Sequence, residues 1–201
     1  MKRWLAIALL APLVAGCAAL QPPRAEVPVI YLLDAQPVAS GERLKRELVL
    51  AISPLRARPG FDTAQIAYVR NPPELDYYAK HRWADTPVRM LAPLVAQALE
   101  QSGGFRAVVQ GSNPIPADLR VDTELVRLQH DFGARPSRVQ LTLRAQLVDL
   151  GARKVLAAKV FDESESAASE DAYGGVTAAN RALARALGRL VDFCIAESAS
   201  R

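Results

Sequence analysis

Cysteine and histidine are both scarce in this chain. Its 201 residues include two cysteines, Cys17 and Cys194, and two histidines, His81 and His130. If Cys17 is modified, as the N-terminal segment below predicts, Cys194 has no partner within the chain, and a disulfide framework is excluded. Neither histidine has a metal-ligand spacing to a cysteine, an aspartate or the other histidine. The sequence therefore predicts no metal site, and an inert, buried thiol at Cys194.

The known catalytic motifs are missing as well. No glycine-rich phosphate loop follows an expected strand, because Gly103 and Gly104 end one predicted helix and Gly174 and Gly175 precede another. No serine lies in a nucleophile-elbow pattern. Four acidic residues gather late in the chain: Glu163, Glu165, Glu170 and Asp171. The serines and alanines around them favour a solvated loop over a metal site. We expect no enzyme, no catalytic residue and no cofactor.

Strong charge of one sign is also lacking. The chain has 25 basic and 21 acidic residues, a net charge of +4, and loss of Lys2 and Arg3 on processing would lower it to near +2. This balance gives no reason to expect nucleic acid as a partner. Half of the residues are hydrophobic, which is typical of one packed globular domain at this length.

The one long apolar run stands at the N-terminus. Lys2 and Arg3 precede an apolar stretch from Leu5 to Val14, which is too short to span a bilayer as a helix. Ala15, Gly16 and Cys17 follow in the register of a lipoprotein signal peptide. The sequence thus predicts a signal peptide over residues 1–16 and acylation of Cys17. The alternative is an ordinary secretory signal with a chance cysteine.

The residues after Cys17 predict how the mature protein is held. Ala18 follows the cysteine, without an aspartate that would favour retention in the inner membrane, so we expect an outer-membrane lipoprotein facing the periplasm. Prolines at Pro22, Pro23 and Pro28 indicate an extended tether over residues 17–28. The folded domain is expected over residues 29–201.

Alternating and β-rich segments predict a sheet. Strands are expected over residues 29–33, 47–52, 65–70, 105–109, 119–130, 138–148 and 154–163, and residues 75–83 leave a further strand open. The apolar phase of residues 119–130 shifts near Leu125 and Val126, which indicates a bulge. Residues 138–148 alternate cleanly, so one face of this strand lies in the core and the other meets water or a partner.

Two helices complete the prediction. Thr86 and Pro87 are typical of a helix start, and Gly103 and Gly104 of its end. Residues 171–197 form a second helix, whose apolar stripe leaves Arg181, Arg185, Arg189 and Asp192 off it. The expected fold class is α/β, bordering on α+β: a single compact domain with a mixed β-sheet packed by two long helices.

Aromatic and basic side chains gather in one segment. It contains Tyr68, Arg70, Tyr77, Tyr78, Lys80, His81, Arg82 and Trp83. Tyrosine, tryptophan and arginine are typical interface anchors, yet rings with polar tips also wedge a loop against a sheet. We predict Tyr77, Tyr78 and Arg82 as partner contacts, because a loop before the helix projects there, and Tyr68 and Trp83 as structural.

The same segment belongs to a longer pattern that resembles a known family, the ABC-type transport auxiliary lipoproteins (PqiC-like proteins). The similarity runs from about Tyr31 to Ile195. It rests on Tyr31-Leu32-Leu33, Leu48-Val49-Leu50 before Pro54, Ile66-Ala67-Tyr68-Val69-Arg70, Leu75-Asp76-Tyr77-Tyr78, Arg82-Trp83, Thr86-Pro87 and Met90-Leu91. The resemblance implies a compact α/β domain related to anticodon-binding-like sheets, and it supplies no catalytic residue.

The resemblance also implies partners. Such lipoproteins are expected to work with an MCE-domain protein and the permease and ATPase of an ABC transporter in lipid transport, docking the periplasmic machinery to the outer membrane. A stand-alone lipid-binding or envelope-assembly lipoprotein is the alternative. The sequence leaves a homo-oligomer open, and it does not specify the lipid or the direction of transport.

Overall fold

The computed structural model describes residues 27–35, 45–111 and 116–200. The predicted signal peptide, Cys17 and all but the last two residues of the predicted tether lie outside these ranges. The elements, in chain order, are β1 (Val29–Tyr31), β2 (Arg46–Ile52), β3 (Arg56–Ala57), β4 (Gln65–Val69), β5 (Asp76–Trp83), α2 (Pro87–Gln101), β6 (Phe105–Gln110), β7 (Leu119–Asp131), β8 (Arg138–Asp149), β9 (Lys154–Ser166), α3 (Ala172–Glu197) and the 3-10 turn η3 (Ser198–Ser200).

Strand β7 organises the nine-stranded mixed sheet. Along one edge it pairs antiparallel with β8, which in turn pairs antiparallel with β9. Along its other edge it pairs in succession with β2, β3 and β4, all parallel. Strand β6 extends the sheet beyond β2, and β5 and β1 extend it beyond β4. The predicted mixed sheet is thus confirmed, as is the bulge, since the β7–β8 register shifts between Leu125 and Arg127.

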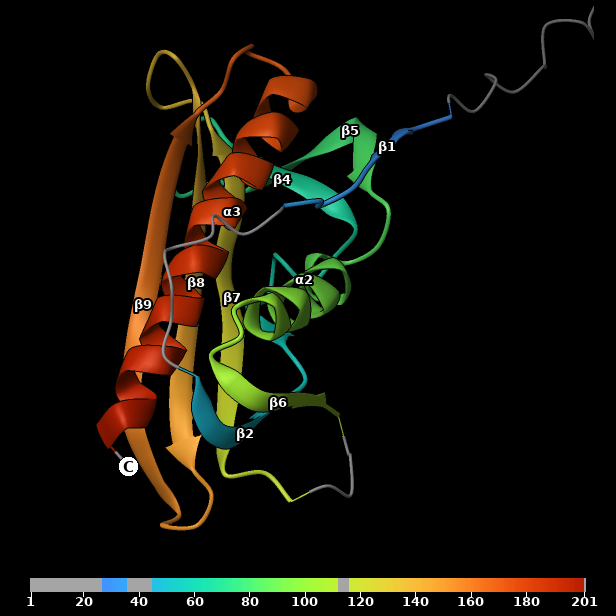
Figure 1. The fold of residues 1–201 in the computed structure, drawn as a ribbon. Coiled ribbons are helices and arrows are strands. Elements are labelled where there is room, and N and C mark those ends of the chain that lie inside the picture. Colours follow the sequence, from blue (N-terminus) through green and yellow to red (C-terminus); the bar gives the residue numbers. More distant parts are fainter. Residues whose placement is uncertain (1–26, 36–44, 112–115, 201) are drawn as a thin grey trace, which may run out of the picture.

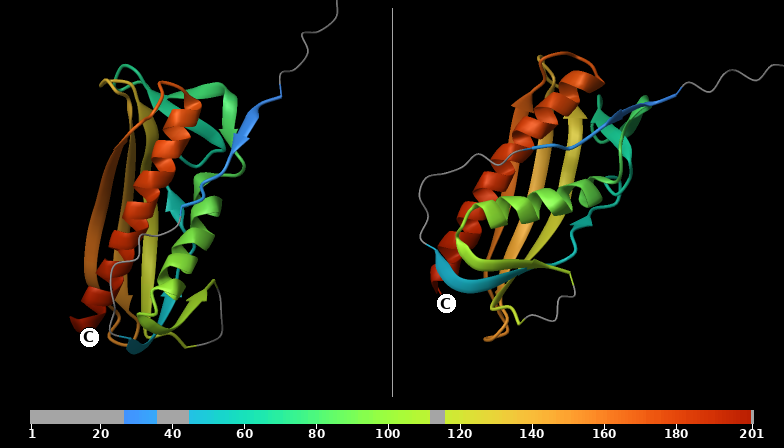
Figure 2. Two further views of the ribbon diagram at one scale, coloured as in Figure 1. Left: turned by 45° about the horizontal axis from the view of Figure 1, so that its top comes forward. Right: turned by 45° about the vertical axis from the view of Figure 1, so that its right-hand side comes forward.

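Both helices pack on one face of this sheet (Figures 1 and 2). Helix α3 lies along β8 and β9, and α2 contacts β6 and α3. The inward side chains of the long strands form one core with the helices, with Leu125, Leu143 and Phe161 fully buried. The outward side chains of β8 are largely polar, as the alternation predicts. The fold is a single α/β domain; the anticodon-binding-like relationship remains a prediction.

Helix α3 confirms the predicted apolar stripe. Leu183, Leu187 and Leu190 are buried, and Cys194 is fully buried, which raises the pKa of its thiol to about 12. The Asp171 carboxylate caps the helix by accepting a hydrogen bond of 2.8 Å from the backbone N–H of Gly174. The glycine pair therefore lies inside the first turn of α3, within the predicted range of residues 171–197, and does not precede the helix.

The prediction of a solvated loop around the acidic residues is wrong for Glu163 and Glu165. Glu163 ends the predicted strand and Glu165 follows it, and both lie in β9, which is three residues longer than predicted. Glu163 accepts hydrogen bonds from Arg185 at 3.0 Å and from Arg189 at 2.6 Å. Glu165 accepts from Arg185 at 2.6 Å and from Arg181 at 2.7 Å. The arginines off the apolar stripe thus tie the outer side of α3 to the edge strand.

Smaller departures have simple physical causes. Strand β3 is only two residues long and therefore gives no alternating pattern to detect. Thr86 occupies the N-cap position of α2, but its side chain makes no capping hydrogen bond. Residues 75–83, left open as a strand, form β5, held between β4 and β1.

Candidate functional site

An aromatic cluster joins β1, β4, β5 and β7 at one end of the sheet. Its members are Tyr31, Tyr68, Tyr78, His81, His130 and Phe132. The Tyr68 and Tyr78 ring centroids lie 4.9 Å apart, and those of His130 and Phe132 lie 4.2 Å apart. The Arg70 guanidinium lies over the Tyr68 and Phe132 rings at 5.4 and 4.7 Å. These contacts hold the short strands of this corner to the long strand β7.

His130 lies at the buried base of the cluster. Its Nδ1 is 3.0 Å from the Tyr78 hydroxyl, and its Nε2 is 2.8 Å from the Ser137 hydroxyl, so both ring nitrogens have hydrogen-bond partners. Burial lowers the pKa of His130, although the carboxylates of Glu170 and Asp171 oppose the shift. Burial likewise raises the pKa of Tyr78 to about 12. The pair is therefore held uncharged near neutral pH.

A serine hydrogen-bonded to a histidine is also the beginning of a catalytic triad, but burial argues against that role here. Ser137 is completely buried and His130 is 2% exposed, so neither has an open position for a substrate. Within the described ranges, no three histidine, cysteine, aspartate or glutamate side chains are placed to hold a metal ion. The geometry of this network thus supports a structural role.

The three predicted contact residues all lie in β5, and their surroundings differ. Tyr77 is half-buried and donates a hydrogen bond of 2.9 Å to the carbonyl of Gly60. Tyr78 is half-buried in the aromatic cluster. Arg82 is exposed. Because these residues are in a paired strand, they do not project from a loop as expected, and Arg82 is the one with its side chain open to a partner.

The two residues predicted to be structural are packed as expected. Trp83 is 3% exposed and belongs to the hydrophobic core. Tyr68 packs within the aromatic cluster, tilted against Tyr78 and at right angles to Phe132.

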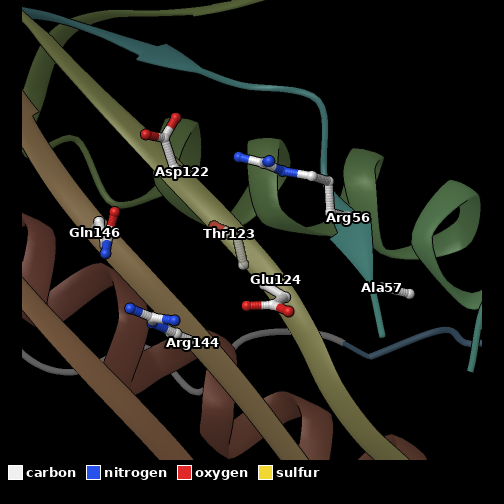
Figure 3. A pocket seen from close by; sticks show the side chains of 7 residues that line it. All are labelled: Arg56, Ala57, Asp122, Thr123, Glu124, Arg144 and Gln146. Atoms are coloured by element: carbon white, nitrogen blue, oxygen red, sulfur yellow. The ribbon is translucent and has the colours of Figure 1, made fainter. Parts of the chain in front are cut away.

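The sheet face opposite the helices is a second candidate surface, which we call the open face. Figure 3 shows side chains of β3, β7 and β8 around a hollow of about 300 Å³: Arg56, Ala57, Asp122, Thr123, Glu124, Arg144 and Gln146. A neighbouring hollow of about 630 Å³ adds Arg58, Val126 and Val160. The polar side of residues 138–148 was predicted to meet water or a partner, but the contribution of β3 was not foreseen, because only the tertiary pairing places it there.

Hydrogen bonds within β7, and one from the residue that follows β2, order the polar side chains of the open face. Arg120 donates to both carboxylate oxygens of Asp122, at 2.9 and 3.0 Å, and Ser53 donates to the same carboxylate. Burial would raise the pKa of Asp122, but these hydrogen bonds outweigh it and lower the pKa. Register places Glu124 opposite Arg144 on one side and Arg56 on the other. A charged, ordered and shallow surface of this kind suits recognition of another polar surface rather than chemistry.

The described helices do not include one that is both long enough and apolar enough to cross a membrane.

Comparison with known structures supports the fold. A crystal structure of a protein from Xanthomonas campestris matches with a TM-score of 0.78 at 22% identity, covering 86% of this chain and 98% of that one. A crystal structure of an uncharacterized protein matches with a TM-score of 0.66 at 13% identity, covering 84% and 99%. At these identities the likeness shows a shared fold alone.

Comparison of sequences identifies the family. No curated protein sequence matches the chain closely enough to count as a relative. A family model, described as the ABC-type transport auxiliary lipoprotein component, matches residues 31–191. The match covers α2, α3 as far as Val191, and all of the described strands except the first two residues of β1. The chain therefore belongs to the ABC-type transport auxiliary lipoprotein family.

Proposed function

We propose that the chain is an outer-membrane lipoprotein that acts as a non-catalytic auxiliary component of an ABC transporter in an MCE-type lipid transport system. In this role it docks the periplasmic machinery to the outer membrane through acyl chains on Cys17. The observation that carries the proposal is the combination of the family match over residues 31–191 with the lipoprotein signal that ends at Cys17.

The geometry supports a docking role over an enzymatic one. Among the described residues, the exposed Arg82 on β5 and the open face around Arg144 offer side chains to a protein partner. The hydroxyl, imidazole and thiol groups of Ser137, His130 and Cys194 are enclosed in the core. A rigid sheet with one covered face and one polar face is suited to binding another protein.

Acylation is tested with a pair of cysteine variants. Cys17→Ala should abolish incorporation of a labelled fatty acid in growing cells, since no other residue of the signal carries a thiol. Cys194→Ala is the matched control and should keep the label, because its thiol is buried in α3. Equal labelling of wild type and Cys17→Ala would contradict the proposal.

Partner contact is tested by photo-cross-linking in intact cells. A photoreactive residue at position 144 or 82 should capture the MCE-domain protein, whereas one at Ala196, an exposed position near the end of α3, should not. Capture of a second copy of the chain alone would indicate a homo-oligomer instead. A stand-alone lipoprotein would give no transporter partner at any position and would retain a lipid through purification.

Alanine substitutions in β5 separate folding from contact. Tyr78→Ala should lower the melting temperature, because it removes a ring packed in the aromatic cluster and a partner of His130. Tyr77→Ala should lower the melting temperature by a smaller amount, because it removes the hydrogen bond to the Gly60 carbonyl. Arg82→Ala should leave the melting temperature unchanged and weaken co-purification of the MCE partner by about 1–3 kcal/mol. If Arg82→Ala retains the partner fully, the contact lies elsewhere.

A further inference from the structure

The exposed apolar side chains of the domain are concentrated at its beginning. Of the seven large hydrophobic residues that are exposed in the described ranges, four lie within six consecutive positions: Val27 (88% exposed), Val29 (48%), Ile30 (57%) and Leu32 (61%). We call these four residues the β1 patch. Scattered exposed hydrophobic residues are normal, but a run of this kind at one edge is typical of a contact surface.

The β1 patch is fixed in place by its neighbours. Strand β1 pairs in parallel with β5, and the residues that follow it are anchored to α3. Asn180 accepts a hydrogen bond from the backbone N–H of Asp34 at 2.8 Å and donates one to the carbonyl of Leu32 at 3.3 Å. Leu33 and Ala35 are buried while Ile30 and Leu32 face outward. Because side chains alternate along a strand, Ile30 and Leu32 lie on one side of this edge segment and Val29 lies on the other. The edge segment therefore exposes apolar side chains on both sides, where water alone would favour polar ones.

The chain itself indicates what covers this patch. Ten residue steps separate Val27 from Cys17, a distance of at most about 36 Å at full extension. An acylated Cys17 would therefore keep the β1 patch within reach of a lipid surface at all times. Such tethering raises the effective concentration of the patch at the bilayer, so that weak apolar contacts suffice to hold it there.

We propose that the β1 patch inserts into the headgroup region of the membrane that carries Cys17. This inference rests on the acylation of Cys17 in the proposed function. It gives the domain one orientation. The corner formed by β1 and β5 meets the lipid, and the turn between β8 and β9, at the opposite end of the long strands (Figure 1), points away from it.

The test uses tryptophan as a depth probe in the acylated full-length protein. The chain has two tryptophans, Trp4 in the predicted signal peptide and the buried Trp83, so the processed protein has a constant background. Leu32→Trp and the matched control Val155→Trp, 54% exposed on β9, are each reconstituted into phosphatidylcholine–phosphatidylglycerol vesicles with or without bromine on the acyl chains near the headgroups. Leu32→Trp should show about two-fold or more quenching by bromine relative to Val155→Trp, because bromine quenches only indoles at this depth.

Other occupants give other results. A blue-shifted emission of Leu32→Trp without bromine quenching would mean that a second copy or another protein covers the patch, and it would overturn the inference. Equal quenching at both positions, or none at either, would overturn both the insertion of the β1 patch and the proposed orientation of the domain. Failure of the proposed acylation is distinguishable, because mass spectrometry would show an unmodified Cys17 and the protein would not float with the vesicles.

Discussion

His130 lies where β7, β5, the segment before β8 and the first turn of α3 meet. Its two ring nitrogens contact the hydroxyls of Tyr78 and Ser137, and its ring packs against Gly175. A buried polar side chain with all its partners in place fixes the relative positions of the elements that supply them.

Stability should depend on pH through His130. Burial lowers its pKa in the folded state below the ordinary value of 6.5. As the pH falls through 6.5 the unfolded chain takes up a proton first, so the free energy of unfolding is highest above this pH and decreases below it. Urea unfolding between about pH 7 and about pH 5.5 measures the slope, in a window above most carboxylate titration.

The matched variants are His130→Gln and His81→Gln. The slope should be shallower in His130→Gln and should persist in His81→Gln, which leaves the Tyr78–His130–Ser137 contacts intact. A wild-type slope in His130→Gln would show that other groups cause the pH dependence.

Gly175→Ala should destabilise the domain although alanine is the better helix former. A Cβ at position 175 would lie 2.5 Å from Nδ1 of His130, too close for a real contact. We expect a loss of about 1–3 kcal/mol, whereas the helix propensity alone would give a gain of about 1 kcal/mol. Combining the change with His130→Ala should remove the penalty. A stabilised Gly175→Ala single variant, measured by urea unfolding, would contradict the packing.

At the scale of elements, helix α3 contacts the sheet in two ways. The inner side of α3 buries leucine and alanine side chains against β8 and β9. Its outer side donates from Arg181, Arg185 and Arg189 to Glu163 and Glu165. Burial would raise the pKa of Glu165, but the arginines outweigh it and lower the pKa. The apolar side supplies most of the stability, because half-exposed ion pairs are worth little in water.

A pair of substitutions on α3 measures this difference. Leu187→Asp should cost several kcal/mol, because it places an unpaired charge where the side chain is fully buried. Arg185→Ala should cost about 1 kcal/mol or less, since its side chain is 39% exposed and Arg189 and Arg181 still hold the two glutamates. Thermal or urea melts of equal midpoint for the two variants would mean that α3 does not pack as described.

At the scale of the whole molecule, the two faces of the sheet have different surroundings. One face shares a continuous core with both helices, and the other presents ordered charges around Arg144. The short strands β2, β3 and β4 pair one after another with the same edge of β7. The corner formed by β1 and β5 is attached through β4 to β7 and through Asn180 to α3, so these two elements fix its position. A shared core of this kind predicts that the domain unfolds as one unit.

Cooperative unfolding is tested by comparing two probes on the processed protein. Trp83 fluorescence reports on the β5 corner, and far-UV circular dichroism reports mainly on α2 and α3. The two urea transitions should coincide, because Trp83 belongs to the same core as the helices. A fluorescence change at lower urea would show that the β1–β5 corner opens separately.

Secondary structure was predicted most accurately where a periodic pattern of apolar residues extends over many positions. The clean alternation over residues 138–148 and the apolar stripe around Leu187 each repeat several times, and both matched the structure. Prediction was weakest where an element is short or its partner distant in sequence. The two residues of β3 and the pairing of Glu163 with Arg185 across 22 positions have no local signal.

The sequence by itself determined the α/β class, both helices, the bulge in β7 and the burial of Cys194, because each follows from local patterns of apolar residues. Only the tertiary structure decided which polar groups meet. It buried His130 and Ser137, and it placed Tyr77 and Tyr78 in β5, where their hydroxyls form hydrogen bonds with Gly60 and His130. It left Arg82, the β1 patch and the open face exposed. The physical reason is that exposure depends on strand order and on which face the helices cover, and neither is encoded within one segment of the chain.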